Sequence, residues 1–313
     1  MPVAVRRVET RTKIPPFEII GAPAAPVVVA LGGISATKHV CSNQRDTTRG
    51  WWEAIAGAGK AIDTRRFRIL SFDYVDGGCD ERGRPLHRVT THDQADALAT
   101  VLDHVGVDRA HAVVGASYGG MVALAFAERH ADRLDSIVVI GAAHTTHPMT
   151  TARRAVQRRI VHLGLDTHRG TEALAIARAL AMTTYRSAEE FAERFSAEPE
   201  GDDADAVFPV ERYLDHHAAR FAAEWQPARF LALSLSGDLH AVDPARIHTP
   251  ATLIAIEDDG IVPLDQMREL ATRIAAPVRL HTLPARNGHD AFLTQPATVG
   301  PIIAGALQSR PVR

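Results

Sequence analysis

A serine between two glycines lies where an apolar run meets a helix-like run, and this junction constrains the fold more than any other feature. Residues 110–114 are short, apolar and typical of a buried strand. The pentapeptide GASYG follows at residues 115–119, and residues 120–129 then show apolar side chains at helical spacing. A strand that turns so tightly into a helix brings two backbones together, which favours glycine on both sides. The turn would leave Ser117 exposed at the sheet edge.

Other apolar runs predict a mainly parallel sheet flanked by helices. Most are short and rich in Val or Ile, and several end at Gly or Asp. Helical patterns alternate with them, as in residues 93–104, and this alternation is typical of crossover helices. The predicted strands are residues 27–31, 68–72, 110–114, 136–140, 251–256 and 278–283.

The alternation of strand and helix patterns stops in the middle of the chain. Residues 147–229 are rich in Ala, Arg and Glu, have helical periodicity and contain no convincing strand, while residues 198–205 are typical of an acidic loop. Roughly eighty residues are too many for one crossover connection. We therefore expect a helical cap of residues 147–229, inserted into a core formed by residues 1–146 and 230–313.

Composition narrows the class of protein. The 313 residues suffice for one large core and an inserted subdomain. The net charge of −2 gives no overall field that would attract nucleic acid or an anionic membrane. One arginine cluster could bind a phosphate, but a solvated helix face is the favoured interpretation. The cluster consists of Arg153, Arg154, Arg158 and Arg159.

The cysteines and the first residues of the chain indicate the cellular compartment of the protein. Cys41 and Cys79 do not form a CxxC pair, which argues against a disulfide framework and a thiolate zinc site. The first twenty residues are charged and lack the apolar core of a signal peptide. No apolar run reaches the length of a membrane span. We expect a cytoplasmic enzyme.

A serine hydroxyl is a poor nucleophile unless a base takes its proton. Sixteen histidines compete for that role, and His289 stands out because it follows the last predicted strand, residues 278–283. Enzymes with a serine on such a strand–helix turn deliver their base there, after the acid in chain order. His289 is therefore the predicted base for Ser117.

The base needs an anion that fixes its tautomer and stabilises the imidazolium. The acid should follow the preceding strand, residues 251–256, where three acidic residues stand in a row. We predict Asp259, because Pro263 follows it four residues later, as in the acid loop of many α/β-hydrolases. Asp258 is the alternative.

Together these features resemble the α/β-hydrolase fold, with a mainly parallel sheet flanked by helices and an inserted helical cap. The chemistry also needs two backbone N–H groups aimed at the developing oxyanion. One belongs to Tyr118, the residue after the nucleophile. We expect the other from Leu31, at the end of an early strand, with Gly32 as the alternative.

Over most of its length the chain resembles the homoserine O-acyltransferase family of the α/β-hydrolases. The motif GHDAFL at residues 288–293 is specific to the family, because other hydrolases rarely continue with D-A-F-L after the histidine. After the strand at residues 68–72, however, residues 73–80 are shorter than the family's glycine- and serine-rich stretch. The matching motifs are ALGGISA at 30–36, GWWE at 50–53, GAGKAIDT at 57–64, GASYGGM at 115–121, VERYL at 210–214 and GHDAFL at 288–293.

The resemblance implies an amino-acid site in the cap. In the family, an arginine lies seven residues before a tyrosine, a spacing that Arg178 and Tyr185 share. Arg178 would bind the amino-acid carboxylate, and Tyr185 and Asp290 would bind its ammonium. The chemistry agrees, because a guanidinium pairs bidentately with a carboxylate and an acid pairs with an amine.

The resemblance also implies the reaction. An acyl-CoA would acylate Ser117, and the hydroxyl of L-homoserine would then take the acyl group, in ping-pong kinetics and as a step of methionine biosynthesis. CoA is a substrate here, so neither a metal nor a bound cofactor is expected. The expected partners are these small molecules and a second copy of the chain in a homodimer, not nucleic acid or membrane.

Ile261 is expected to set the acyl donor. In the family, users of succinyl-CoA tend to carry an arginine two residues after the catalytic aspartate, and users of acetyl-CoA an aliphatic residue. Burying a succinyl carboxylate without a cation is costly, so Ile261 predicts acetyl-CoA. Arg82 and Arg84 could supply a charge from another direction, which leaves succinyl-CoA as the alternative.

Other functions share part of this site. Serine as acceptor differs from homoserine by one methylene, a difference worth only about 1–3 kcal/mol. An esterase or thioesterase would use the same triad with water, but would not need the cluster of Arg178, Tyr185 and Asp290. A catalytically silent binding protein would not need an intact Ser117 and His289.

Overall fold

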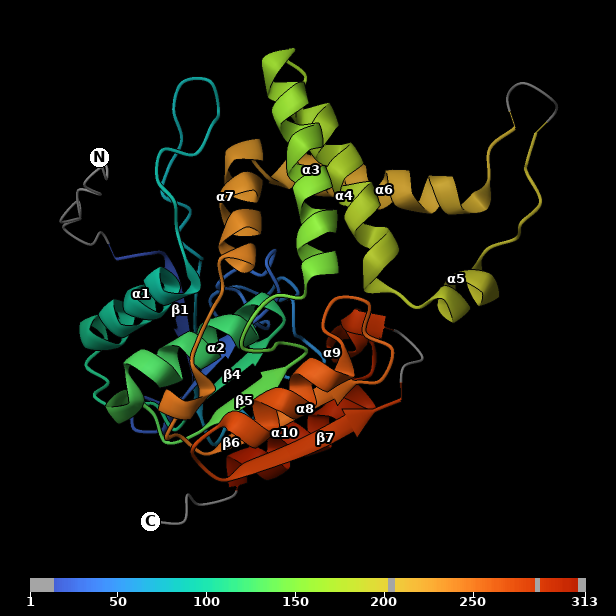
Figure 1. Cartoon of the computed structure of the whole chain (residues 1–313). Coiled ribbons are helices and arrows are strands. Elements are labelled where there is room, and N and C mark those ends of the chain that lie inside the picture. The colour runs from blue at the N-terminus through green and yellow to red at the C-terminus, as the bar shows by residue number, and fades with distance from the viewer. Residues whose placement is uncertain (1–13, 202–205, 285–287, 309–313) are drawn as a thin grey trace.

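The computed structural model describes residues 14–201, 206–284 and 288–308, and a seven-stranded sheet forms the centre of this part (Figure 1). The strand order is β1-β3-β2-β4-β5-β6-β7. Only β1 runs antiparallel to its neighbour, and the other described pairs are parallel. The strands are β1 (Phe17–Ile20), β2 (Val27–Leu31), β3 (Arg68–Phe72), β4 (Ala112–Ala116), β5 (Ile137–Ile140), β6 (Ala251–Ile256) and β7 (Val278–Leu283).

Most of the predicted strands are confirmed to within two residues. Four of them, β2, β3, β6 and β7, have the predicted bounds. β4 continues through Gly115 and Ala116, because these two residues still pair with Val139 and Ile140 of β5. The sequence missed β1, whose residues are half-buried at the sheet edge and alternate too weakly to indicate a strand.

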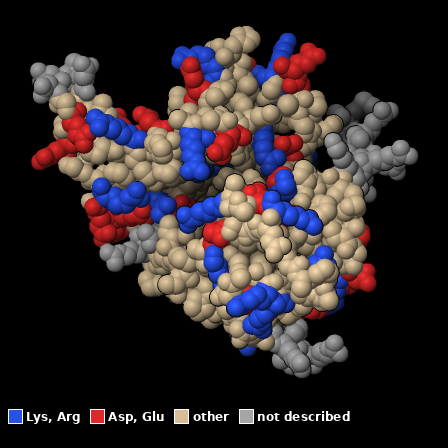
Figure 2. Space-filling model, turned by 180° about the vertical axis from the view of Figure 1, so that it is seen from behind, with Lys and Arg blue, Asp and Glu red and all other residues tan. Residues whose placement is uncertain are grey.

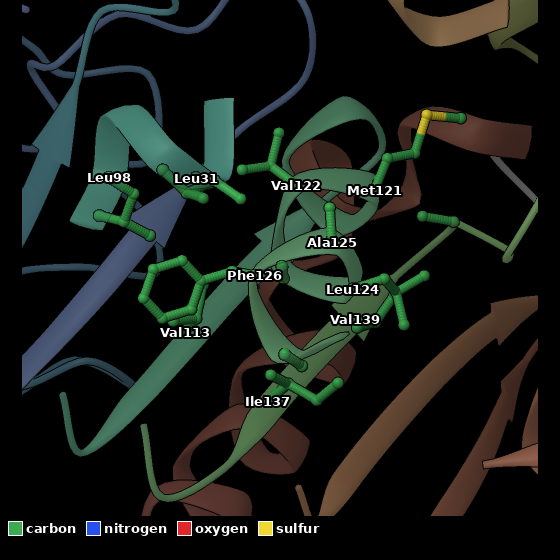
Figure 3. Packing of buried hydrophobic residues seen from close by; sticks show 14 of the residues in the cluster. Leu31, Leu98, Val113, Met121, Val122, Leu124, Ala125, Phe126, Ile137 and Val139 are labelled. Atoms are coloured by element: carbon green, nitrogen blue, oxygen red, sulfur yellow. The ribbon is translucent and has the colours of Figure 1, made fainter. Parts of the chain in front are cut away.

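Helices cover both faces of the sheet. One hydrophobic cluster joins the sheet to α1, α2 and α8, and a second joins its other face to α10. Figure 3 shows part of the first cluster, in which Phe126 of α2 lies beside Val113 of β4. The helices of the core are α1 (Thr91–His104), α2 (Tyr118–Arg129), α8 (Leu264–Arg273), α9 (Ala291–Thr294) and α10 (Pro296–Gln308).

A group of helices lies beyond the sheet, between β5 and β6 in the chain (Figure 1). Three of them begin with proline at the first position, where its missing N–H costs no hydrogen bond. The predicted cap end at residue 229 falls inside α7. The helices are α3 (Pro148–Asp166), α4 (Gly170–Tyr185), α5 (Ala188–Arg194), α6 (Pro209–Glu224) and α7 (Pro227–Asp238).

The surface has a mixed charge. Figure 2 shows basic and acidic side chains intermixed over one face of the molecule. Across the described ranges, no helix combines the length and apolar character needed to cross a membrane. Two pockets lined by Ser117 open between the sheet and the helices that follow β5.

Candidate active site

Ser117 occupies the tight turn between β4 and α2. Its φ of 54° and ψ of −120° are strained for a residue other than glycine, and such strain is often found at functional sites. A Cβ on Gly115 would overlap the carbonyl oxygen of Gly119, and one on Gly119 would overlap that of Leu31. Both positions therefore require glycine, as the sequence pattern predicted. The turn places Ser117 at the carboxyl edge of the sheet.

The structure brings together the three residues predicted as a triad. His289 Nε2 lies 2.8 Å from Ser117 Oγ, and His289 Nδ1 lies 2.7 Å from Asp259 Oδ2. Asp259 follows β6, and His289 lies in the one-turn helix η4 (Gly288–Asp290) after β7. Adjacent parallel strands end at the same sheet edge, so residues far apart in the sequence meet there. This arrangement can move a proton from a hydroxyl to an imidazole.

The backbone around Asp259 selects it over its neighbour Asp258. The Oδ1 atom of Asp259 accepts hydrogen bonds from the N–H groups of Ile261 and Val262, at 2.8 and 3.0 Å. These bonds hold the carboxylate so that Oδ2 points at His289. Asp258 is exposed to solvent. Asp259, and not the alternative acid of the sequence analysis, is therefore the hydrogen-bond partner of the imidazole.

The surroundings of His289 act on its pKa in opposite directions. Burial lowers the pKa, because a charged imidazolium is poorly solvated inside the protein. The charge of Asp259, its hydrogen bond and, to a smaller extent, the charge of Asp290 raise the pKa and together more than offset burial. The net result is a pKa above the ordinary value for histidine. The pair therefore stabilises the protonated imidazole that would form when Ser117 loses its proton.

The two predicted oxyanion donors differ in what the structure shows of them. Tyr118 is the first residue of α2, where an N–H group has no partner within the helix. Leu31 is the last residue of β2 and pairs with Gly115. The carbonyl of Gly32 accepts hydrogen bonds from Gly119 N–H at 2.9 Å and from the hydroxyl of Tyr74 at 2.8 Å. These bonds fix the loop after β2, while the roles of Leu31 and Gly32 as donors stay predictions.

Two pockets open beside Ser117, and Ile34, Arg178 and Tyr185 line both of them. We call the first the α3 pocket, because α3 supplies much of its wall, and the second the Asp290 pocket. The α3 pocket is further lined by residues that include Met121, Thr150, Arg153, Arg154, Gln157 and Ile261. The Asp290 pocket is further lined by residues that include Gly33, Ser35, Trp51, His289, Asp290 and Phe292.

Arg178 stands between the two pockets on α4. Its guanidinium lies over the rings of Tyr185 and Phe221, at 5.3 and 4.7 Å from the ring centres. Its Nε is buried and has no hydrogen-bond partner within the described ranges. A buried donor without a partner is costly, so the site has the capacity to bind an acceptor group from a ligand.

Asp290 lies in the second pocket, beside a cation that the sequence analysis missed. Arg186 Nε lies 3.3 Å from Asp290 Oδ2, and only 15% of the aspartate side chain is exposed. Burial raises the pKa of Asp290, and Arg186 offsets part of that effect. The one hint in the sequence was that Arg186 directly follows Tyr185. An ammonium bound by Asp290 would share this carboxylate with Arg186.

The expectation that the arginine cluster of α3 is a solvated face is wrong for most of its members. Arg153, Arg154 and Arg158 are half-buried, and only Arg159 is exposed. Arg154 Nε lies 2.7 Å from Asp238 Oδ1, and Arg158 Nη1 lies 2.6 Å from Asp238 Oδ2. Asp238 is at the end of α7, so helix packing brings this acid to α3. Local charge patterning could not reveal the pairing.

Comparisons with known proteins agree with the fold. A family model described as alpha/beta hydrolase fold matches residues 26–296. The solved structure of esterase E22 has a TM-score of 0.83 and 19% identity, covering 93% of this chain and 93% of that chain. At that identity the likeness shows the fold alone.

Relatives in sequence carry names that include two acyl groups and two amino acids. A homoserine O-succinyltransferase of Xanthomonas campestris pv. campestris is 41% identical and covers 94% of this chain and 78% of its own. A serine O-succinyltransferase of Litchfieldella anticariensis is 32% identical, with coverages of 87% and 85%. A homoserine O-acetyltransferase of Haloarcula marismortui is 30% identical, with coverages of 90% and 83%.

Proposed function

The chain belongs to the α/β hydrolase fold family and, within it, to the homoserine O-acyltransferases, and on that premise we propose that it moves an acyl group from acyl-CoA to the side-chain hydroxyl of L-homoserine. One observation carries the proposal. Arg178, with its unsatisfied guanidinium nitrogen, and Asp290, with its buried carboxylate, line one pocket together with Ser117 and His289. A zwitterionic amino acid has the complementary pair of charges.

The first half-reaction forms an acyl-enzyme. Ser117 Oγ attacks the thioester carbonyl while His289 Nε2 takes the hydroxyl proton, and Asp259 stabilises the imidazolium. The tetrahedral oxyanion accepts hydrogen bonds from the N–H groups of Tyr118 and Leu31. The C–S bond then breaks, and the thiolate of CoA takes the proton from His289. The products are free CoA and an acyl ester on Ser117.

The second half-reaction reverses the roles. The hydroxyl of homoserine gives its proton to His289 and attacks the acyl carbonyl. The bond from the carbonyl to Ser117 Oγ breaks, and the serine oxygen regains the proton from His289. Arg178 holds the acceptor carboxylate, while Asp290 and Tyr185 hold its ammonium. Because CoA leaves before homoserine attacks the acyl-enzyme, the two substrates react in turn with ping-pong kinetics.

Two amino acids fit the acceptor site. Homoserine and serine differ by one methylene, which a pocket separates by only about 1–3 kcal/mol. The relatives are named for homoserine and for serine, and either amino acid fits the same three binding groups. Homoserine is preferred here because two of the three relatives described above carry that name.

The donor expected from the sequence was acetyl-CoA, on the ground that Ile261 offers no cation. Ile261 does line the α3 pocket. The same wall, however, contains Arg153 and Arg154, so Ile261 does not define its character alone. The Xanthomonas relative, named as a succinyltransferase, is in line with a charged donor.

A matrix of substrates tests the proposal against hydrolysis. Release of CoA and formation of O-acylamino acid are measured with acetyl-CoA and succinyl-CoA, each with homoserine, serine or water alone. We expect amino acid to accelerate turnover and to appear in the product. If CoA release were independent of amino acid and yielded only the free acid, the chain would be a thioesterase. Labelling of Ser117 by a fluorophosphonate separates both from a silent binding protein.

A further inference from the structure

The wall of the α3 pocket is positively charged. Arg153, Arg154 and Arg178 line it, and the residues described around it include no aspartate or glutamate. Guanidinium groups are always protonated, so this charge cannot be removed by titration. Burying a cation without an anionic partner is costly. A pocket built in this way is suited to an anionic ligand.

Arg153 reaches the acid loop from the cap. Its Nη1 donates a hydrogen bond of 2.7 Å to the carbonyl of Gly260, and Thr150 Oγ1 donates one of 2.7 Å to the carbonyl of Ile261. The partner of Arg153 is thus a neutral peptide oxygen. Its guanidinium lies beside the residue that directly follows Asp259. The cap therefore supplies, from α3, the cation that the side chain of Ile261 does not.

Arg154 shares its one acidic partner. Asp238 pairs with Arg154 and with Arg158, and the side chains of these three residues are 6%, 18% and 15% exposed, in that order. One carboxylate thus faces two guanidinium groups. Arg154 also donates from Nη2 to Thr146 Oγ1 at 3.1 Å. These contacts fix the direction of its side chain while leaving an uncompensated positive charge at the pocket.

The wall of the pocket offers cationic groups to two different anions. Under the proposed function, Arg178 binds the carboxylate of the acceptor at the boundary between the pockets. Arg153 and Arg154 remain, and Ile261 and Met121 add apolar surface to the same pocket. An acyl chain with methylenes and a charge at its far end has groups that complement both the apolar and the cationic side chains of this wall.

We propose that Arg153 and Arg154 bind a carboxylate at the far end of the donor's acyl chain. The donor is then the CoA thioester of a dicarboxylic acid of succinyl length, instead of acetyl-CoA. This inference rests on the proposed acyl transfer through Ser117. Arg153 and Arg154 determine the choice of acyl group and take no part in the bond changes.

The phosphates of CoA and the carboxylate of the acceptor offer the same arginines similar chemistry. Butanoyl-CoA separates the first source, because it has the CoA and the chain length of succinyl-CoA but no distal charge. The KM for homoserine separates the second. Arg159 provides a matched control, since it lies on α3 but is exposed and is absent from the pocket wall.

The test compares kcat/KM for succinyl-CoA and butanoyl-CoA at saturating homoserine. The proteins are the wild type, Arg153→Gln, the double variant Arg153→Gln with Arg154→Gln, and Arg159→Gln. We expect the wild type to prefer succinyl-CoA and the succinyl-to-butanoyl ratio to fall about 10- to 100-fold in the double variant. Arg159→Gln should leave the ratio unchanged. Arg153→Gln, which breaks only a bond to a carbonyl, keeps the test valid if the double variant does not fold.

Each other result overturns the inference in a distinguishable way. An equal loss with both donors would place the arginines at the CoA phosphates, and a rise confined to the KM for homoserine would place them at the acceptor. A wild type that prefers the neutral donor would also contradict it. In all three cases CoA release would still depend on Ser117, so the proposed function would stand. If Ser117 were acylated by neither donor, the proposed function itself would fail.

Discussion

His289 Nδ1 and Asp259 Oδ2 form a hydrogen bond of 2.7 Å, and the two side chains are 3% and 0% exposed. Because Asp259 accepts this bond, the Nδ1 atom of a neutral His289 carries the proton and Nε2 is free to face Ser117. Solvent screens such a buried pair weakly. The charge on the imidazole is therefore set by Asp259 and by the loss of solvation together.

The raised pKa of His289 predicts the acidic limb of the pH profile. A general base must be neutral, so kcat/KM for acyl-CoA should fall as the pH drops through the pKa of His289 in the free enzyme. Because that pKa is raised, the fall should begin above the ordinary histidine value of about 6.5. The measurement is kcat/KM from pH 5 to 9. A limb below the ordinary value would contradict the account.

Replacing the acid should change both the rate and this limb. In Asp259→Asn the larger raising influences on the pKa of His289 are lost, while the lowering effect of burial and the smaller raising effect of Asp290 remain, so the limb should move to lower pH. The wrong tautomer should also reduce kcat by about 10⁴. Asp258→Asn is the control, because its exposed side chain lies one residue away. Similar losses in both variants would show that Asp259 has no special role.

Ser117→Ala should abolish the release of CoA. Removing the nucleophile of such a triad typically costs on the order of 10⁶ in turnover. The check is release of CoA thiol from acyl-CoA, together with the mass of the intact protein after a single turnover in the wild type. More than a few per cent of the activity remaining in Ser117→Ala would disprove a covalent mechanism.

Arg178→Ala should weaken binding of the acceptor amino acid far more than binding of the acyl-CoA donor. Its buried Nε lacks a partner in the free protein, and loss of a charge-assisted contact to a carboxylate should raise the KM for homoserine by about 10- to 100-fold. The control is Arg169→Ala, at the start of the same helix with a side chain that is 70% exposed. Equal changes in the KM of both substrates would remove Arg178 from the acceptor site.

Gly119→Ala should destabilise the fold itself. The added Cβ would overlap the backbone oxygen of Leu31, which cannot swing away as a side chain could. We expect a loss of about 1–3 kcal/mol or more in the free energy of unfolding. Gly305→Ala in α10 is the matched change, since its Cβ would meet no heavy atom within 4 Å, and it should gain up to about 1 kcal/mol. Denaturant unfolding of both variants measures this difference, and equal stability of the two would contradict the account.

Much of the fold could be predicted because its signals are local. The buried strands β2, β3, β6 and β7 are continuous apolar runs, and such runs are visible in any window of the sequence. β1 was missed because an edge strand is half-buried and its pairing with β3 comes from outside its own sequence. The end of β4 was placed two residues early, since glycine normally indicates that a strand has stopped.

The sequence by itself determined the strand, the glycines and the serine of the turn, and the order in which acid and histidine follow. The turn depends on backbone geometry within a few residues, and the acid and the histidine each follow an apolar run. A local stretch of sequence is therefore enough to predict these features. The spacing to Pro263 favoured Asp259 over Asp258, and the tertiary structure shows Asp259 against His289. Tertiary structure alone decided that Arg186 accompanies Asp290 and that Arg154 turns inward to Asp238, 84 residues away. The role of a charged side chain depends on the opposite charge beside it. Packing of the cap against the core determines which charges meet.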